Sequence, residues 1–290
     1  MQYLVDHGIS VSKSSELSGM SRQSFYYRPR ERIKALDPDI SIKIREIVEQ
    51  RPSYGTRRVR ALIRRSGITI SRKKVQRHMR AMNLIKTHNK RHRNNLPRRI
   101  IVARLNRLWE TDFTKIYIDG DGWVHFLAQM DVCSRKIKGY LVSRMARTHE
   151  TIQCLDNGIL DEFPDLVITG LTIRSDNGSQ YTSHKYEEHL RTLHIPHETT
   201  HPSTPEQNGH MESCFGRFKE DYIYSRDFRS YDEFRLYMDW AVHDYNTQRP
   251  HSALGYLTPE EFESRMCDPG FRESWIEKEK GRLKDYVVLE

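Results

Sequence analysis

The chain has 290 residues, of which 37% are hydrophobic and 30% are charged, a composition that suits one core domain of about 160 residues with one or two small helical domains. It contains no run of ~18 apolar residues and no signal-peptide segment near its N-terminus, which argues against a membrane protein and against export. We therefore expect a cytoplasmic protein without a membrane partner.

Charge is divided unevenly along the chain. Residues 1–100 contain 25 Lys and Arg against 7 Asp and Glu, whereas residues 101–290 carry a net charge of −9. Residues 51–100 contain 17 basic side chains and no acidic one. A surface this basic displaces counterions from phosphate groups, so we expect the N-terminal part to bind double-stranded DNA. A basic patch that contacts RNA or a membrane surface is the alternative.

Residues 1–34 predict a short N-terminal helical arm or a partial helix-turn-helix. Within residues 11–27 a helical stretch is followed by a glycine turn and by a second helix that Ser21 would cap. This order is typical of half a DNA-binding motif. A structural arm that packs Phe25, Tyr26 and Tyr27 elsewhere fits the same residues.

Residues 37–85 predict a three-helix, helix-turn-helix DNA-binding domain. Ile40, Ile44, Ile47 and Val48 form the apolar stripe of a first helix over residues 39–50. Thr56 would cap a second helix, which buries Val59, Leu62 and Ile63 and stops at Gly67. Ser71 would cap a third helix, with Val75, Met79 and Met82 facing inward.

The third helix resembles a recognition helix for the DNA major groove. Its predicted outward residues are Arg72, Lys73, Gln76, Arg77 and Arg80. Arg side chains pair with guanine and Gln side chains with adenine in that groove. A small helical bundle with a cationic face is the alternative. Residues 86–100 are polar and basic without apolar periodicity, and we interpret them as a linker that follows the DNA backbone.

Residues 101–265 predict an α/β core. Three consecutive antiparallel strands are expected at 112–118, 124–131 and 137–143, followed by a helix over 149–160 and a strand at 171–174. The four cysteines are widely spaced and should be unpaired thiols.

Asp112, Asp176 and Glu212 stand out within this core. Asp112 lies in the first strand, and Asp176 follows the strand that ends near residue 174. Glu212 lies in a helix that runs towards Tyr222, and an apolar stripe should bury one side of that helix. The stripe consists of Met211, Phe215, Phe218 and Tyr222, and a second stripe beside it consists of Asn208, Glu212 and Lys219.

Three carboxylates without Cys or His partners suit hard divalent cations, Mg²⁺ or Mn²⁺. In a two-ion site such ions stabilise the attacking and leaving oxygens of a displacement at phosphorus. The alternative is that these three, like most acidic residues, are solvated at the surface. Asp131 is a second candidate for the first ligand, although a turn or salt-bridge role is favoured for it.

At these residues the chain resembles the DDE transposase and retroviral-integrase superfamily, and within it the bacterial insertion-sequence transposases with an integrase-type catalytic core. The motifs that carry the resemblance are WETD at 109–112, DVCSR at 131–135, RSDNGSQY at 174–181, HPSTPEQNGHME at 201–212, YNTQRPHSALG at 245–255 and TPEEF at 258–262. The resemblance covers residues 37–264. Residues 266–290 lie beyond it and are an unassigned C-terminal tail.

The resemblance implies an RNase H-like core, a mixed five-stranded sheet with flanking helices, preceded by small all-α helix-turn-helix domains. It also implies metal-dependent cleavage at the ends of a mobile element and transfer of the freed 3′ hydroxyl into target DNA. Asp112, Asp176 and Glu212 would be the catalytic metal ligands of two ions. Lys219 and Asn208 would position the substrate phosphate, with Gln207 near the same DNA strand. Arg249 and His251 reach DNA or, alternatively, form a structural turn.

Paired end cleavage requires two active sites, so a homo-oligomer on DNA is expected, associated with the nucleoid. Elements of this type often encode an upstream frame whose product joins the catalytic one, and such a protein is a further expected partner. Two other functions are open at this point. One is an RNase H-like, structure-selective DNA nuclease without joining activity, and the other is a catalytically disused DNA-binding protein.

Overall fold

The computed structural model describes residues 1–27, 35–85, 99–200, 209–281 and 286–289. The chain forms two compact units, Met1–Ile40 and Ser41–Glu290. Among the described helices none has the length and apolar character needed to cross a membrane.

The first unit contains three short helices, α1 (Gln2–Asp6), α2 (Val11–Ser18) and α3 (Arg22–Tyr26). The predicted glycine turn and Ser21 cap are confirmed, because Gly19 has a left-handed φ of 65° and the Ser21 hydroxyl accepts a hydrogen bond from the Ser24 amide. Tyr26 and Tyr27 remain exposed.

The helix-turn-helix region contains α4 (Pro38–Gln50), α5 (Thr56–Arg65) and α6 (Arg72–Ala81). The predicted inward residues Ile44, Val59, Ile63, Val75 and Met79 are fully buried, while Leu62 and Met82 are partly exposed. Ser71 caps α6 as predicted, accepting from the Lys74 amide at 3.2 Å. The prediction that Thr56 caps α5 is wrong. Gly55 takes the extended cap conformation, so Thr56 is already the first helical residue.

The core is built on a five-stranded sheet with the order β4-β3-β2-β5-β6. Its strands are β2 (Leu108–Ile118), β3 (Gly122–Asp131), β4 (Ile137–Ser143), β5 (Thr172–Ser175) and β6 (His197–Thr199). β2, β3 and β4 pair antiparallel, whereas β5 runs parallel to β2 and β6 parallel to β5. This mixed sheet confirms the expected RNase H-like fold and the three predicted antiparallel strands.

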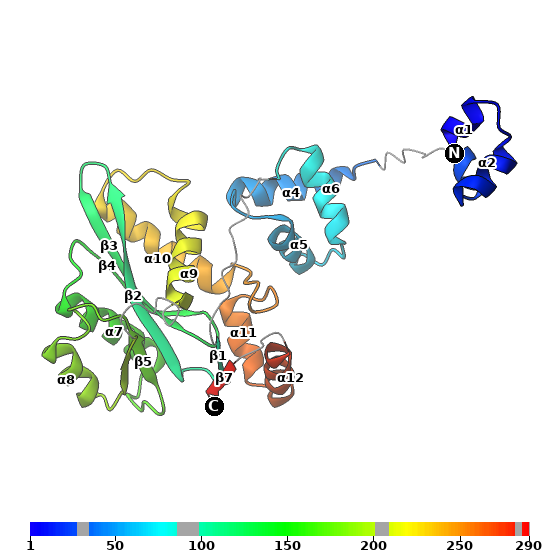
Figure 1. Cartoon of the computed structure of the whole chain (residues 1–290). Helices are drawn as coiled ribbons and strands as arrows, with labels where there is room; N and C mark the ends of the chain where they lie inside the picture. Colours follow the sequence, from blue (N-terminus) through cyan, green and yellow to red (C-terminus); the bar gives the residue numbers. More distant parts are fainter. Residues whose placement is uncertain (28–34, 86–98, 201–208, 282–285, 290) are drawn as a thin grey trace. The chain divides into compact units, whose positions relative to one another are not determined.

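Helices cover both faces of the sheet (Figure 1). One face packs on α7 (Thr148–Glu162) and α8 (His184–Thr192) through a core that includes Trp109 and Ile173. The other face packs on α9 (Gly209–Phe218), η2 (Lys219–Ile223) and α10 (Tyr231–Thr247) through a core that includes Ile116 and Phe126. The two cores follow from the alternation of side chains along β2, whose odd and even residues point to opposite faces.

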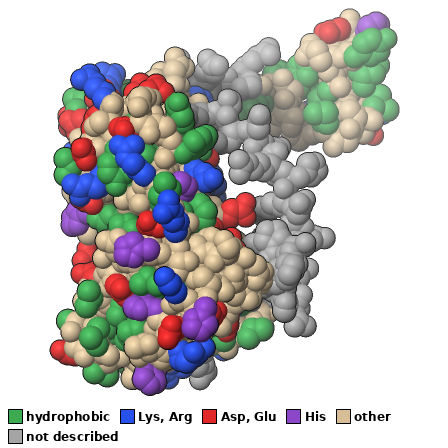
Figure 2. Space-filling view, turned by 90° about the vertical axis from the view of Figure 1, so that its left-hand side faces the viewer, with side chains coloured by type: hydrophobic (Ala, Val, Ile, Leu, Met, Phe, Trp, Pro, Cys, Tyr) green, Lys and Arg blue, Asp and Glu red, His purple; other side chains and the backbone are tan. Residues whose placement is uncertain are grey.

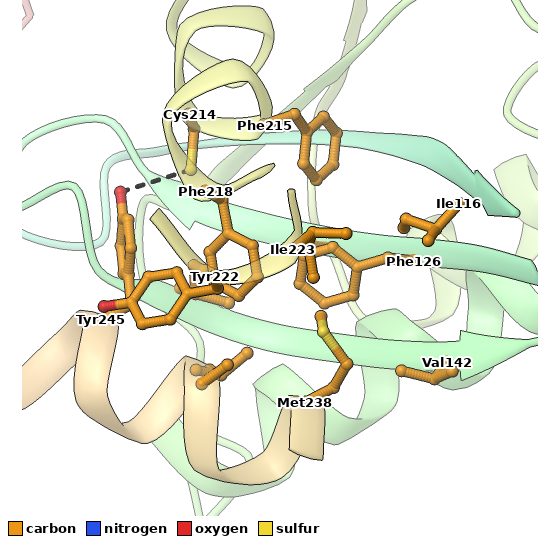
Figure 3. Packing of buried hydrophobic residues seen from close by; sticks show 14 of the residues in the cluster. Ile116, Phe126, Val142, Cys214, Phe215, Phe218, Tyr222, Ile223, Met238 and Tyr245 are labelled. Carbon is orange, nitrogen blue, oxygen red and sulfur yellow. Dashed lines mark hydrogen bonds between the residues drawn. The ribbon is translucent and has the colours of Figure 1, made fainter. Parts of the chain in front are cut away.

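The helix that carries Glu212 is held by the apolar stripe predicted for it. Met211, Phe215, Phe218 and Tyr222 are all buried in the core beneath it. The Phe218 ring lies 5.2 Å from that of Phe126 on β3 (Figure 3). The helix changes to π-helix geometry at Lys219, a feature that the spacing of the stripe does not predict.

Residues 266–290 are not a simple tail. They include the last residue of α11 (Pro259–Met266), then α12 (Pro269–Lys280) and β7 (Tyr286–Leu289). β7 pairs in parallel with β1 (Arg99–Val102), and the Trp275 ring lies 5.2 Å from that of Phe262. The C-terminal segment therefore completes the core. All four cysteines are free, as predicted.

Candidate active site

Asp112 lies on the face of β2 that packs against α9. Its Oδ1 accepts a hydrogen bond of 2.8 Å from the Phe113 amide. Burial, as the largest cause, together with the negative charges of Asp176, Glu110 and Glu212, raises the pKa of its carboxyl to about 7, against the lowering effect of the Phe113 hydrogen bond. A desolvated carboxylate among other carboxylates favours either a proton or a cation.

Asp176 follows the end of β5, beside Asp112. The parallel register pairs Glu110 with Arg174, and two positions further along the chain stand Asp112 on β2 and Asp176 just past the end of β5. The predicted turn follows at once, because Asp176 Oδ1 accepts from the Gly178 amide at 2.9 Å. This short side-chain turn fixes the direction in which the carboxyl group points.

Glu212 lies in the first turn of α9, with an exposed side chain. The amide of Met211, one residue earlier, donates to Glu110 Oε2 at 3.2 Å, which ties the start of the helix to β2. The first turn of a helix also stabilises a carboxylate, because the positive end of the helix dipole lies there.

The structure thus places the three carboxylates on one side of the sheet, with Asp176 and Glu212 both close enough to raise the pKa of Asp112. Within the described parts of the chain, however, no three His, Cys, Asp or Glu side chains are arranged to hold a metal ion as they stand. The oxygen chemistry of the trio fits a hard divalent cation. The side chains would have to close further around one.

Lys219 lies near the same site, on η2. Its ammonium donates to the backbone carbonyl of Lys115 at 3.0 Å, three residues beyond Asp112 on β2. Partial burial lowers the pKa of this ammonium. Gln207 and Asn208, the other predicted DNA contacts, lie outside the described residues.

Asp131 does not share the site. It pairs across the sheet with Trp109, and directly paired residues point to the same face, so its side chain points away from Asp112. Its Oδ2 accepts from the Ser134 amide at 2.9 Å, which gives it the turn role favoured by the sequence. Arg249 and His251 are buried and hydrogen-bonded to each other, so they form a structural turn rather than a DNA contact.

On α6, the predicted recognition residues Arg72, Lys73 and Arg80 are exposed, and Gln76 and Arg77 are partly exposed. Not all basic residues of this region are directed to solvent alone. Arg51 and Arg58 form ion pairs with acidic residues of the core. On the face of the core drawn in Figure 2, by contrast, Lys and Arg side chains are interspersed with Asp, Glu and His.

Two family models described as "Integrase core domain" match residues 103–205 and 193–259, and one described as "HTH-like domain" matches residues 36–92. The transposase for insertion sequence element IS904 of Lactococcus lactis subsp. lactis (strain IL1403) is 29% identical over 239 residues, which cover 77% of this chain and 93% of that protein. The chain belongs to the insertion-sequence transposases with an integrase core.

Two further proteins are similar to this transposase. The transposase InsD for insertion element IS2A/D/F/H/I/K of Escherichia coli is 28% identical over 249 residues, covering 80% of this chain and 81% of that protein. Among solved structures, the catalytic core domain of HTLV-2 integrase in complex with magnesium is similar to the transposase with a TM-score of 0.42 and 20% identity. That similarity covers 55% of this chain and 97% of the integrase chain.

Sequence reasoning missed three residues of the transposase that lie beside the candidate ligands, Glu110, Arg174 and His210. Glu110 is fully buried and contacts both of the others. Each stands two residues before one of the three carboxylates. The sequence contains this shared spacing. Its role becomes apparent only in the fold, where the two strands and the helix lie side by side.

Proposed function

We propose that this transposase cuts DNA at the ends of its element and joins the freed 3′ hydroxyl to a target phosphodiester, with Asp112, Asp176 and Glu212 as the metal ligands. What supports the proposal is the meeting of β2, the end of β5 and the first turn of α9, where burial and the carboxylates of Asp176, Glu110 and Glu212 raise the pKa of Asp112. Like charges held together in a partly desolvated place repel one another until a cation neutralises them. Such a cluster is a functional-site candidate on physical grounds.

The donor set suits Mg²⁺ or Mn²⁺, two ions for each site. Asp112, Asp176 and Glu212 would hold them. When bound, two such ions supply positive charge to the attacking and the leaving oxygen of an in-line displacement at phosphorus. Asp112 is fixed by the sheet and Asp176 by its turn, so both present their oxygens from rigid elements.

Lys219 would hold the substrate phosphate beside the carboxylates. Its ammonium is partly buried and donates to the carbonyl of Lys115, a bond that it could exchange for one to a phosphate oxygen. Asn208 is assigned to the same phosphate, and Gln207 to the same DNA strand, by the sequence pattern alone. The side chains of α6 that face outward would bind the element end in the major groove.

Two copies of the transposase would act together, because both ends of an element must be cut and joined in one event. A homo-oligomer assembled on DNA, at the nucleoid, satisfies this requirement. A protein encoded by an upstream frame of the same element is a further partner in the proposal.

The test uses labelled duplexes that end in candidate element termini, incubated with the full chain and Mg²⁺. We expect nicks at the 3′ end of the element and joined products in target DNA. Asp112→Asn should abolish both while DNA binding persists, and Asp119→Asn, in the exposed turn after β2, is the matched control. Cleavage that survives in Asp112→Asn would overturn the assignment.

A duplex whose end is already cut separates the remaining alternatives. Joining of this substrate supports a transposase that performs strand transfer. Cleavage of the uncut duplex without joining of the pre-cut one would identify a nuclease. The absence of both reactions would identify a catalytically disused DNA-binding protein.

A further inference from the structure

A chain of polar contacts joins the three elements that carry the candidate ligands. Glu110 on β2 accepts from the Met211 amide of α9 through Oε2 at 3.2 Å, and its Oε1 lies 3.0 Å from His210 Nδ1. Arg174 on β5 approaches Oε1 to 3.9 Å, and its other side donates to Glu198 on β6 at 2.7 Å. The contacts therefore run from β6 through β5 and β2 to the first turn of α9.

The three residues that make these contacts all have the same sequence spacing from the candidate ligands. Glu110 precedes Asp112 by two residues, Arg174 precedes Asp176 by two, and His210 precedes Glu212 by two. On a strand, residues two apart point to the same face, so Glu110 lies on the same face of β2 as Asp112, while Arg174 lies near the end of β5 that Asp176 follows. On α9, Glu110 contacts both the Met211 backbone amide and the His210 side chain. These contacts fix the turn that carries Glu212.

Glu110 is fully buried, with 0% of its surface exposed. A buried carboxylate is costly unless hydrogen bonds or charges compensate it. Here both oxygens are engaged, one by the Met211 amide and the other by His210 and Arg174. Because these partners already occupy its oxygens, Glu110 is placed as a support for the site rather than as one of its ligands.

We infer that Glu110 is the positioning residue that sets the first turn of α9 against β2 and β5, so that Glu212 can reach the same cation as Asp112 and Asp176. This inference rests on the proposed function. The apolar stripe of α9 holds the body of the helix, since Phe215 and Phe218 are buried in the core beneath it. What Glu110 adds is the position of the N-terminal turn, which the stripe alone leaves free to tilt.

The decisive measurement is Mn²⁺ binding to the full chain by calorimetry, without DNA. Supporting groups behind metal ligands typically change affinity by about 10- to 100-fold when removed. We expect Glu110→Ala to weaken Mn²⁺ binding about 10-fold or more. Glu110→Gln retains an oxygen that can accept from the Met211 amide, so it should recover part of the lost affinity.

A matched control lies on the next turns of the same helical segment. Glu220 makes an exposed ion pair with Arg217, and Glu220→Gln should bind Mn²⁺ like the unmodified chain. Cleavage gives a second readout: Glu110→Ala should need more Mn²⁺ for half-maximal rate but approach the unmodified rate at saturation. A loss of rate at saturating Mn²⁺ with unchanged half-saturation would overturn a positioning role.

The outcomes are separable from those of the proposed function. If Asp112→Asn binds Mn²⁺ normally, the metal site itself is wrong. If Asp112→Asn loses binding while a folded Glu110→Ala keeps it, only the role of Glu110 is wrong. Should Glu110→Ala fail to melt cooperatively, Glu110→Gln and His210→Ala decide instead, and unchanged affinity in both would overturn the inference.

Discussion

Arg51 and Asp244 form a two-bond ion pair, with Nη1 2.6 Å from Oδ2 and Nη2 2.6 Å from Oδ1, between the residue after α4 and the core helix α10. Arg58 adds a second pair, 3.0 Å from both oxygens of Asp221. Both guanidinium groups also lie over the ring of Tyr54. Part of the positive charge of the helix-turn-helix region is therefore neutralised by the catalytic core.

The Arg51–Asp244 pair should contribute strongly to stability. Its side chains are 17% and 6% exposed, and removal of one partner from a buried pair leaves an uncompensated charge. We expect Arg51→Ala to lower the free energy of unfolding by about 3 kcal/mol. Arg65→Ala breaks a more exposed pair with Glu261 and should cost at most about 1 kcal/mol. Urea unfolding of both variants checks this.

A double-mutant cycle with Asp244→Ala isolates the pair from other effects. The coupling between Arg51 and Asp244 should exceed that between Arg65 and Glu261. Equal couplings would show that the more buried Arg51–Asp244 pair stabilises this chain no more than the more exposed pair.

DNA affinity should depend on α6 and not on the arginines that face the core. Arg72 and Lys73 are exposed at the start of α6, whereas Arg58 is engaged by Asp221. Each phosphate contact removed lowers the salt dependence of binding by about one unit in the slope of log affinity against log salt concentration. We expect this change for Arg72→Ala and Lys73→Ala, measured on an element-end duplex. Arg58→Gln should leave the slope unchanged, and a reduced slope there would place DNA on α5.

The stability of the metal-free chain should depend on the ionisation of Asp112. The pKa of this carboxyl is raised from 3.8 to about 7, so between these values the folded state binds a proton that the unfolded state has lost. The free energy of unfolding therefore falls as pH rises through this window. Asp112→Asn removes the fall and should be more stable above about pH 7, by on the order of 2–4 kcal/mol.

Urea unfolding in a chelator at about pH 4 and about pH 8 measures the difference. The two chains should be nearly equal at the lower pH and diverge at the higher one. In saturating Mg²⁺ the order should reverse, because only the unmodified chain gains binding energy. A difference that does not change with pH would show that Asp112 ionises normally in the folded state.

The sequence predicted most of the sheet and the helix that carries Glu212, because period and turn residues are local signals. The stripe of Met211, Phe215 and Phe218 is an example, since each of these residues is buried where its spacing places it. Thr56 was misassigned because a cap is decided by one residue's backbone angles, and Gly55 adopts them instead.

The remaining features could not be predicted because they arise between segments that are distant in sequence. The parallel pairing of β1 with β7 brings residue 99 beside residue 286. The contact of Glu110 with Met211 spans about a third of the chain. The positions of Asp112, Asp176 and Glu212 as candidates came from their flanking motifs, and their roles as ligands stay a prediction.

Gly139 offers a test of how closely β4 packs on α7. A Cβ atom at this position would lie 2.6 Å from the Cys154 carbonyl oxygen and 2.8 Å from the Gly158 amide, both of them backbone atoms of α7. Backbone cannot yield as a flexible side chain can, so Gly139→Ala must push the helix away from the sheet. Overpacking of this kind costs about 1–3 kcal/mol, and we expect the upper part of that range.

Gly216 on α9 is the matched control, because a Cβ atom there would meet nothing within 4 Å. In a helix interior Ala is favoured over Gly by about 0.5–1 kcal/mol, so Gly216→Ala should raise stability. Thermal and urea unfolding of the two variants should therefore shift in opposite directions. Equal stability of Gly139→Ala and the unmodified chain would mean that α7 lies farther from β4 than these distances allow.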